Sequence, residues 1–246
     1  MIVTGTRAHG LSKRRPIDVM GATFYKSEWM ECGADPALSP TVFLVEQPPN
    51  TELVSHFHRQ NQFQLFVDGA GSIGREALGA VTVHYAGAYT GYGPLLSGAQ
   101  GIQYFTIRAV CEAGFTPISE AKEKMRRGPK RHANSKPVVP LTAAALAALT
   151  LSEQHTLIEP LEGMGARLTR LPPGAALKPL PVPGCEGQFL FVTAGTLQHA
   201  GVTLSLWEHL FLLAAESGDA APVLTAGAGG AEIVALFIPP KEAAYA

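Results

Sequence analysis

The sequence is poor in cysteine and has almost no excess charge of either sign. Its 246 residues include three cysteines, Cys32, Cys111 and Cys185, which are odd in number, far apart and without a CxxC pair. This pattern argues against a disulfide framework or a structural zinc site and fits a reducing cytoplasm, with Cys111 as a small buried apolar residue. The formal net charge of −1 gives the whole chain no attraction for nucleic acid or an anionic membrane.

Long apolar runs are also missing. No segment approaches the roughly 20 consecutive apolar residues that a membrane helix needs. Residues 1–19 have no apolar stretch after their basic residues, whereas an export signal requires one. We therefore expect no membrane span and no export, and we place the protein in the cytoplasm.

Glycine and proline, by contrast, are abundant, with 26 and 19 residues spread along the chain. They separate short runs of β-branched and aromatic residues, which is the pattern of an all-β protein. One group of runs lies at 41–48, 62–67, 80–85 and 102–110, and a second at 166–171, 188–193, 202–207, 209–214 and 231–238. The chain is therefore predicted to contain two β units.

The segment between the two groups is predicted to be a linker with short helices. One helix follows Ser119 and ends before Gly128, and another follows Thr142, since serine and threonine cap helix starts. We expect a first domain at 1–117, the linker at 118–155 and a second domain at 156–246. Acidic residues interrupt the basic run at 122–136 and no aromatic residues accompany it, so it is interpreted as a solvated linker that binds no nucleic acid.

The two β units resemble each other in sequence. Residues 48–69 and 172–195 both begin with Pro-Pro and later carry Gln-Phe and Gly in the same order, with two extra residues before Gln188. A repeat on this scale indicates an internal duplication.

His56 and His58 are the residues most suited to chemistry. Because side chains alternate along a strand, both imidazoles should lie on one face and Phe57 on the other. Imidazole nitrogens bind divalent metals, and a third ligand from the next strand would leave positions open for water or substrate. Gln62 stands four residues further on, so His56, His58 and Gln62 are the predicted metal ligands.

This segment resembles the first motif of the cupin superfamily, G(x)5HxH(x)3,4E(x)6G. The spacing agrees from His56 through Gln62 to Gly69, whereas Asn50 replaces the opening glycine and Gln62 the acidic residue. The resemblance implies two tandem cupin barrels, of the jelly-roll or double-stranded β-helix type, joined by the linker. It also implies a divalent metal, iron, manganese, nickel or zinc, and a histidine as fourth ligand about 35 to 45 residues further along.

No histidine stands at the place of the fourth ligand. Tyr92 or Gln103 could complete the set, and His84 comes one strand too early. The alternative is a barrel without metal, in which His56 and His58 hydrogen-bond Gln62 and Tyr92 and an organic ligand binds directly. The predicted pocket residues are Tyr92, Gln103, Gln64, Phe66 and Arg108.

The charged residues near this site have more general expected roles. Arg59, Arg75 or Arg108 could bind an anionic group, and Glu46 and Asp68 are the nearest acids, each a general base only if it points inward.

The second β unit offers no comparable ligands. Leu180 and Val182 stand where the histidines would be if the Pro-Pro pairs are aligned, and Val182 and Gly184 if Gln188 is aligned. Neither pair offers ligands, so this unit is predicted to be structural, with His209 as a satisfied core residue. A GxGxxG pattern at 69–74 follows a strand, as a dinucleotide-binding fingerprint does, but the residues after it predict a strand where that fold needs a helix.

Two functional hypotheses therefore stay open. The first is a cupin-type enzyme, a dioxygenase or an isomerase, that uses a divalent metal on a small polar or carboxylated metabolite. The second is a non-catalytic module that binds or senses a small molecule. In either case we expect a homodimer, because small antiparallel barrels expose edge strands that pairing can cover.

Overall fold

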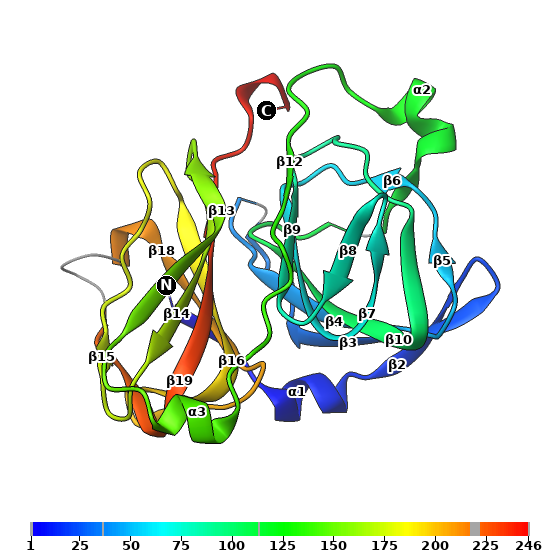
Figure 1. The fold of residues 1–246 in the computed structure, drawn as a ribbon. Helices are drawn as coiled ribbons and strands as arrows, with labels where there is room; N and C mark the ends of the chain where they lie inside the picture. Colours follow the sequence, from blue (N-terminus) through cyan, green and yellow to red (C-terminus); the bar gives the residue numbers. More distant parts are fainter. Residues whose placement is uncertain (1, 36, 113, 217–221, 246) are drawn as a thin grey trace. The chain divides into compact units, whose positions relative to one another are not determined.

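The chain is built almost entirely from antiparallel strands, which confirms the all-β prediction (Figure 1). A computed structural model describes residues 2–35, 37–112, 114–216 and 222–245. Within these residues, no helix has the length and apolar character needed to cross a membrane.

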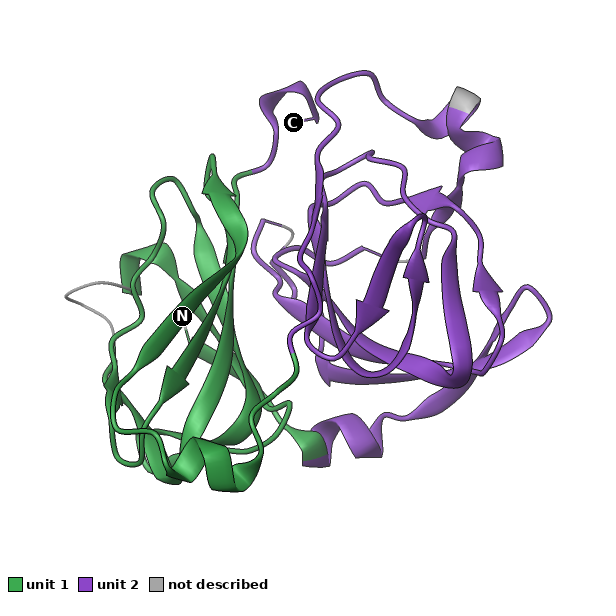
Figure 2. Ribbon diagram, viewed as in Figure 1, with its two compact units in different colours: residues 1–7, 139–240 green, residues 8–138, 241–246 purple. Residues whose placement is uncertain are grey.

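The chain forms two compact units that do not follow the chain order at its ends (Figure 2). Residues 8–138 and 241–246 form one unit, called here the His unit because it contains His56 and His58. Residues 1–7 and 139–240 form the other, called here the Leu unit after its leucine-rich core. These limits differ from the predicted division at 1–117, 118–155 and 156–246, since each terminus belongs to the unit at the other end of the sequence.

The His unit is organised around β7 (Gln62–Ile73), which lies between β9 (Thr82–Ala86) and β10 (Leu95–Arg108). β4 (Thr41–Gln47), β3 (Ala22–Met30) and β2 (Arg15–Val19) extend the sheet beyond β10, and β12 (His132–Asn134) pairs with β9. The shorter strands are β5 (Glu52–Leu53) on β10, β8 (Glu76–Gly79) on β7, and the pair β6 (His56–Phe57) and β11 (Thr116–Pro117). Gly69 and Gly71 lie within β7, and β8 follows directly after Gly74 and Arg75, so a strand stands where a dinucleotide-binding fold needs a helix, as predicted.

The Leu unit repeats this connectivity around β16 (Gly187–His199), which lies between β18 (His209–Leu213) and β19 (Leu224–Ile238). β14 (Met164–Leu171) and β13 (Glu153–Leu161) continue beyond β19, while β15 (Ala176–Leu177) pairs with β19 and β17 (Val202–Leu204) with β16. At the edge that β12 occupies in the His unit, β1 (Ile2–Gly5) from the N-terminus pairs with β18.

One glycine in each unit shows the internal repeat at atomic detail. Gly69 and Gly195, which align in the sequence, both adopt positive φ angles, 74° and 70°. A Cβ atom at Gly69 would overlap the carbonyl oxygen of Gly101, and one at Gly195 would overlap that of Gly230. The same bend and the same close backbone approach therefore recur in both units.

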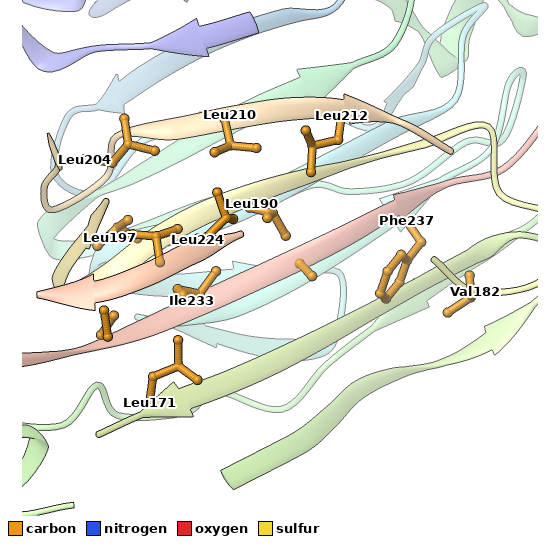
Figure 3. Packing of buried hydrophobic residues seen from close by; sticks show 14 of the residues in the cluster. Leu171, Val182, Leu190, Leu197, Leu204, Leu210, Leu212, Leu224, Ile233 and Phe237 are labelled. Carbon is orange, nitrogen blue, oxygen red and sulfur yellow. The ribbon is translucent and has the colours of Figure 1, made fainter. Parts of the chain in front are cut away.

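Leucine dominates the core of the Leu unit (Figure 3). Leu190 on β16 lies between Leu210 and Leu212 on β18 and Ile233 and Phe237 on β19, and all five are nearly inaccessible to solvent. Residues of this core recur at every second position of these strands, at 190 and 192, at 210 and 212, and at 233, 235 and 237, so the alternation in the sequence produces a single apolar face.

Short helices lie outside the sheets: α1 (Arg7–Ser12), η1 (Ile118–Glu120), α2 (Ala121–Lys124), α3 (Ala143–Ala147), η2 (Ala214–Glu216) and η4 (Ala243–Tyr245). Thr142 caps α3 through its hydroxyl, which accepts a hydrogen bond from the Ala145 amide, as predicted. The predicted cap at Ser119 is wrong, because Glu120 precedes α2 and its side chain makes no capping bond.

The prediction that the cysteines stay unpaired is also wrong. Cys32 and Cys111 form a disulfide with their Cα atoms 5.5 Å apart, and both residues are exposed. β4 pairs with both β3 and β10 and so brings together the ends of these strands, although 79 positions separate the cysteines in the sequence. The argument from cysteine usage to a reducing compartment therefore loses its basis.

Candidate functional site

The HxH segment lies at a cavity inside the His unit. His56 and His58 are 2% and 8% exposed, and both line the cavity. Phe57 points away from it and packs with Tyr89 and Tyr245. The expected alternation of these three side chains is therefore present.

The cavity has a volume of about 270 Å³ and a mostly apolar wall. Its polar groups include His56, His58, Gln62, Gln64 and Arg108. The apolar wall includes Phe24, Phe43, Val45, Leu53, Tyr104 and Phe115.

A chain of hydrogen bonds connects Gln62 to the backbone of Val54. The Gln62 Nε2 donates to the Tyr92 hydroxyl at 2.7 Å, and this hydroxyl lies 2.9 Å from the His56 Nε2. The His56 Nδ1 lies 2.7 Å from the Val54 carbonyl, which only accepts. The His56 proton is therefore on Nδ1, and Tyr92 donates its own proton to the lone pair of Nε2.

Arg108 enters the same network as a cation. Its Nε and Nη2 donate to the Gln62 Oε1 at 2.9 and 2.6 Å, and its Nη2 also donates to the His58 Nδ1 at 3.1 Å. Its Nη1 donates to the Glu112 carbonyl at 2.7 Å. Since a guanidinium has no acceptor, the His58 Nδ1 must present a lone pair and Gln62 must turn its oxygen toward Arg108.

Burial keeps both imidazoles neutral. It lowers the pKa of His56 to about 4, against the hydrogen bond to Val54. Burial, assisted by the Arg108 charge, holds the pKa of His58 well below its usual range. Burial also raises the pKa of the Tyr92 phenol, so at neutral pH these three groups are uncharged and Arg108 carries the charge of the cluster.

These residues do not fit a divalent metal as they stand. The lone pairs of His56, His58 and Gln62 that would bind one are already hydrogen-bonded to Tyr92 or to Arg108. A metal beside His58 and Gln62 would also stand next to a buried positive charge. Within the described part of the chain, no three His, Cys, Asp or Glu side chains converge on a point where they could hold an ion.

Some predicted pocket residues lie elsewhere. Gln103 points away from the cavity and bonds Asp68 in an exposed contact, because Tyr104, Thr106 and Arg108 form the inward-facing set on β10. Phe66 is buried in the neighbouring core cluster, where its ring lies 5.1 Å from that of Tyr104.

The acids singled out from the sequence face outward as well. Glu46 pairs with Arg14 in an exposed bond, and Asp68 bonds Gln103. Of the arginines, Arg75 lines a different cavity and Arg59 contributes its backbone amide to Glu112.

Sequence reasoning missed one residue of the site and set aside another residue that packs against the site. Glu112 lines the cavity, with its Oε2 3.9 Å from the His58 Nδ1, and burial raises the pKa of its carboxyl. His84, which was set aside as one strand too early, packs on Tyr92 with the ring centroids 4.7 Å apart and lines a different cavity. His84 precedes Tyr92 by eight residues and Glu112 follows the last predicted strand of the first group, so no spacing rule pointed to either.

Where the repeat would place a cavity in the Leu unit, the described residues line only a small pocket. The pocket beside Gln188 and Leu180 measures only about 30 Å³. His209 is fully buried, and its ring stacks on that of Phe191 with the ring centroids 4.3 Å apart. Its Nδ1 contacts the Trp207 carbonyl, as expected of a core residue.

No family model matches the sequence, and no curated protein is similar to it at a significant level. Solved structures do resemble the fold. The bacterial pirin YhhW from Escherichia coli, in complex with nickel(II), aligns with 98% of this chain and 100% of its own, at 13% identity and a TM-score of 0.58.

Two oxalate decarboxylases show the same likeness. The enzyme of Lactobacillus farciminis, in a formate complex, aligns with 94% of this chain and 85% of its own, at 8% identity and a TM-score of 0.59. The enzyme of Bacillus subtilis, described for its Mn(II) centres, aligns with 95% of this chain and 77% of its own, at 9% identity and a TM-score of 0.58. At these identities the likeness shows the fold alone, and the cupin fold predicted from the motif is confirmed.

Proposed function

We propose that the His unit is a binding module for a small organic molecule, which it holds in its cavity without a metal. The observation that supports this proposal is the cavity of about 270 Å³, which has a mostly apolar wall and the buried Arg108 among its lining residues. Its volume lies just below the range of about 300–1,000 Å³ typical of pockets for drug-sized ligands, so a small metabolite suits it.

The unused polar atoms of the cavity indicate the chemistry of this ligand. The Oε1 of Gln64 is buried and makes no hydrogen bond within the described residues, and a buried carbonyl without a donor is unfavourable. The four bonds of Arg108 leave one N–H on its Nη1. A ligand with a hydroxyl or N–H for Gln64 and a carboxylate or carbonyl for Arg108 would satisfy both.

Titration calorimetry with three probes tests this proposal. Benzoate carries the acid alone, phenol the hydroxyl alone, and 4-hydroxybenzoate carries both. We expect 4-hydroxybenzoate to bind most tightly of the three, and the variant Thr106→Phe, which fills the cavity, to weaken binding by about tenfold or more.

The matched control is Gln103→Phe, on the same strand but on its outward face. It should leave the affinity unchanged. Equal affinities of wild type and Thr106→Phe for all three probes would refute binding in this cavity.

A second candidate function is the metal-dependent cupin enzyme predicted from the motif. It is supported by the nickel(II) and Mn(II) of the similar structures, and it requires Arg108 to release the lone pairs of His58 and Gln62 to which it now donates. Near-stoichiometric metal in the purified protein, lost in His56→Ala, would support this candidate over the first.

The remaining expectations about partners stay predictions. Homodimerisation through a sheet edge is tested by light scattering of the purified chain. The absence of a nucleic-acid partner is tested by titration with duplex DNA at low salt. A cytoplasmic location likewise remains a prediction.

A further inference from the structure

A single nitrogen of Arg108 contacts two of the three predicted metal ligands. Its Nη2 lies 2.6 Å from the Gln62 Oε1 and 3.1 Å from the His58 Nδ1, and the side chain is 2% exposed. We infer that the guanidinium of Arg108 takes the place of the metal ion in the His unit, and that its presence excludes a divalent cation from His56, His58 and Gln62.

The first argument is the direction of the lone pairs. A metal would draw the His58 Nδ1 and the Gln62 Oε1 toward itself, and the guanidinium does the same through N–H groups. Arg108 lies 46 residues after Gln62, just beyond the 35 to 45 residues at which the cupin motif implies the last metal ligand. The segment that would complete a metal site therefore supplies a cation instead.

The second argument explains why position 62 is a glutamine. The amide accepts two bonds from Arg108 through Oε1 and donates one to Tyr92 through Nε2. A carboxylate would have no N–H for Tyr92, whose own proton is directed to His56. The departure from the acidic residue of the motif thus belongs to the same arrangement as Arg108.

The third argument is electrostatic. The imidazoles of His56 and His58, the Gln62 amide and the Tyr92 phenol are all neutral, so they can surround one positive charge but offer no negative charge to balance a second. Glu112 is the nearest acid, and its Oε2 is 3.9 Å from the His58 Nδ1. A divalent ion added beside Arg108 would therefore meet strong repulsion.

Removal of the guanidinium should convert the cluster into a metal site. We would titrate Co²⁺, whose visible absorption reports coordination by imidazole, into the wild type and the double variant Arg108→Leu/Gln62→Glu. The wild type should show no site spectrum, and the double variant should bind one Co²⁺ with an affinity higher by about 100-fold or more. Adding His58→Ala to the double variant should abolish the spectrum.

Arg108→Lys is the matched control for charge. It keeps a cation at the site, so it should stay free of Co²⁺ like the wild type. Circular dichroism and thermal melting establish that each variant is folded, and the wild-type titration decides the inference even if the double variant does not fold.

Two outcomes would overturn the inference. One is stoichiometric Co²⁺ binding by the wild type that His56→Ala removes, which would support the metal-dependent candidate function. The other is a folded double variant that gains no affinity for Co²⁺. Both are separate from the calorimetry with organic probes, so the metal-free binding function can fail without this inference failing.

Discussion

At the scale of single residues, the Tyr92 hydroxyl joins two parts of the buried network. It accepts a bond from the Gln62 amide and donates one to the His56 Nε2. Both neighbours are almost completely shielded from solvent, so neither has water as a substitute partner. The hydroxyl therefore contributes to stability mainly by preventing two unsatisfied buried groups.

Tyr92→Phe tests this role. The substitution keeps the ring but leaves the Gln62 Nε2 and the His56 Nε2 without their partner. We expect the free energy of unfolding to fall by about 1–3 kcal/mol, measured by urea denaturation at pH 7.

Tyr104→Phe is the control, because this ring lines the same cavity but its hydroxyl makes no hydrogen bond within the described residues. It should change the free energy of unfolding by no more than about 0.5 kcal/mol. Equal losses in the two variants would contradict the role given to Tyr92.

The sequence predicted the direction of a side chain in this site wherever the alternation of side chains along one strand determines it. The HxH spacing correctly put both imidazoles on one face and Phe57 on the other. It did not decide between Gln103 and Arg108, because a register shift interrupts the pairing of β10 with β7 between Gln103 and Tyr104. Such an irregularity depends on the partner strand, and the inward set of β10 was therefore not predictable from its own sequence.

At the scale of strands, the lengths of β7 and β10 also depend on their partner strands and were not predictable from the sequence of each strand alone. The apolar runs predicted where β7 and β10 lie, but β7 continues to Ile73 and β10 begins at Leu95. These extensions pair with β8 and β5, and their glycine and polar residues carry little strand signal of their own. Pairing partners, and not local preference, determine where these strands end.

A buried charge on β19 links three strands of the Leu unit. Glu232 is fully buried, and its Oε2 accepts from the Arg170 Nε on β14 at 2.8 Å. Its Oε1 accepts from the Thr193 hydroxyl on β16 at 2.9 Å. The carboxylate thus satisfies donors from both strands that flank β19.

Glu232→Ala should strongly destabilise the Leu unit. It leaves Arg170 without its buried partner and Thr193 without its acceptor, and removal of one member of a buried ion pair costs about 3–5 kcal/mol. Chemical denaturation followed by the fluorescence of Trp207, with Trp29 replaced by Phe in all samples, measures the loss.

Glu153→Ala is the control for this prediction. Glu153 also pairs with Arg170, at 3.5 Å, but 44% of its side chain is exposed. Its removal should cost at most about 1 kcal/mol. A loss as large as that of Glu232→Ala would mean that burial does not decide the strength of the pair.

At the scale of the whole molecule, the two ends of the chain are exchanged between the units. Residues 2–5 supply β1 to the sheet of the Leu unit, and residues 241–246 belong to the His unit. Neither segment is long enough to show a periodicity, and a strand of four residues does not specify which sheet edge it joins. This exchange was therefore beyond prediction from the sequence, whereas the two β units and their repeat were not.

The C-terminal segment should stabilise the His unit selectively. Tyr245 is 2% exposed, its ring lies 4.9 Å from that of Tyr89, and its hydroxyl donates to the Pro129 carbonyl at 2.7 Å. Tyr245→Ala removes a buried ring and should cost about 3–5 kcal/mol, while Tyr245→Phe, which loses only the hydroxyl, should cost about 1 kcal/mol. Hydrogen exchange should then show faster exchange across 8–138 and unchanged protection across 139–240, and an equal acceleration in both ranges would refute the assignment of this segment to the His unit.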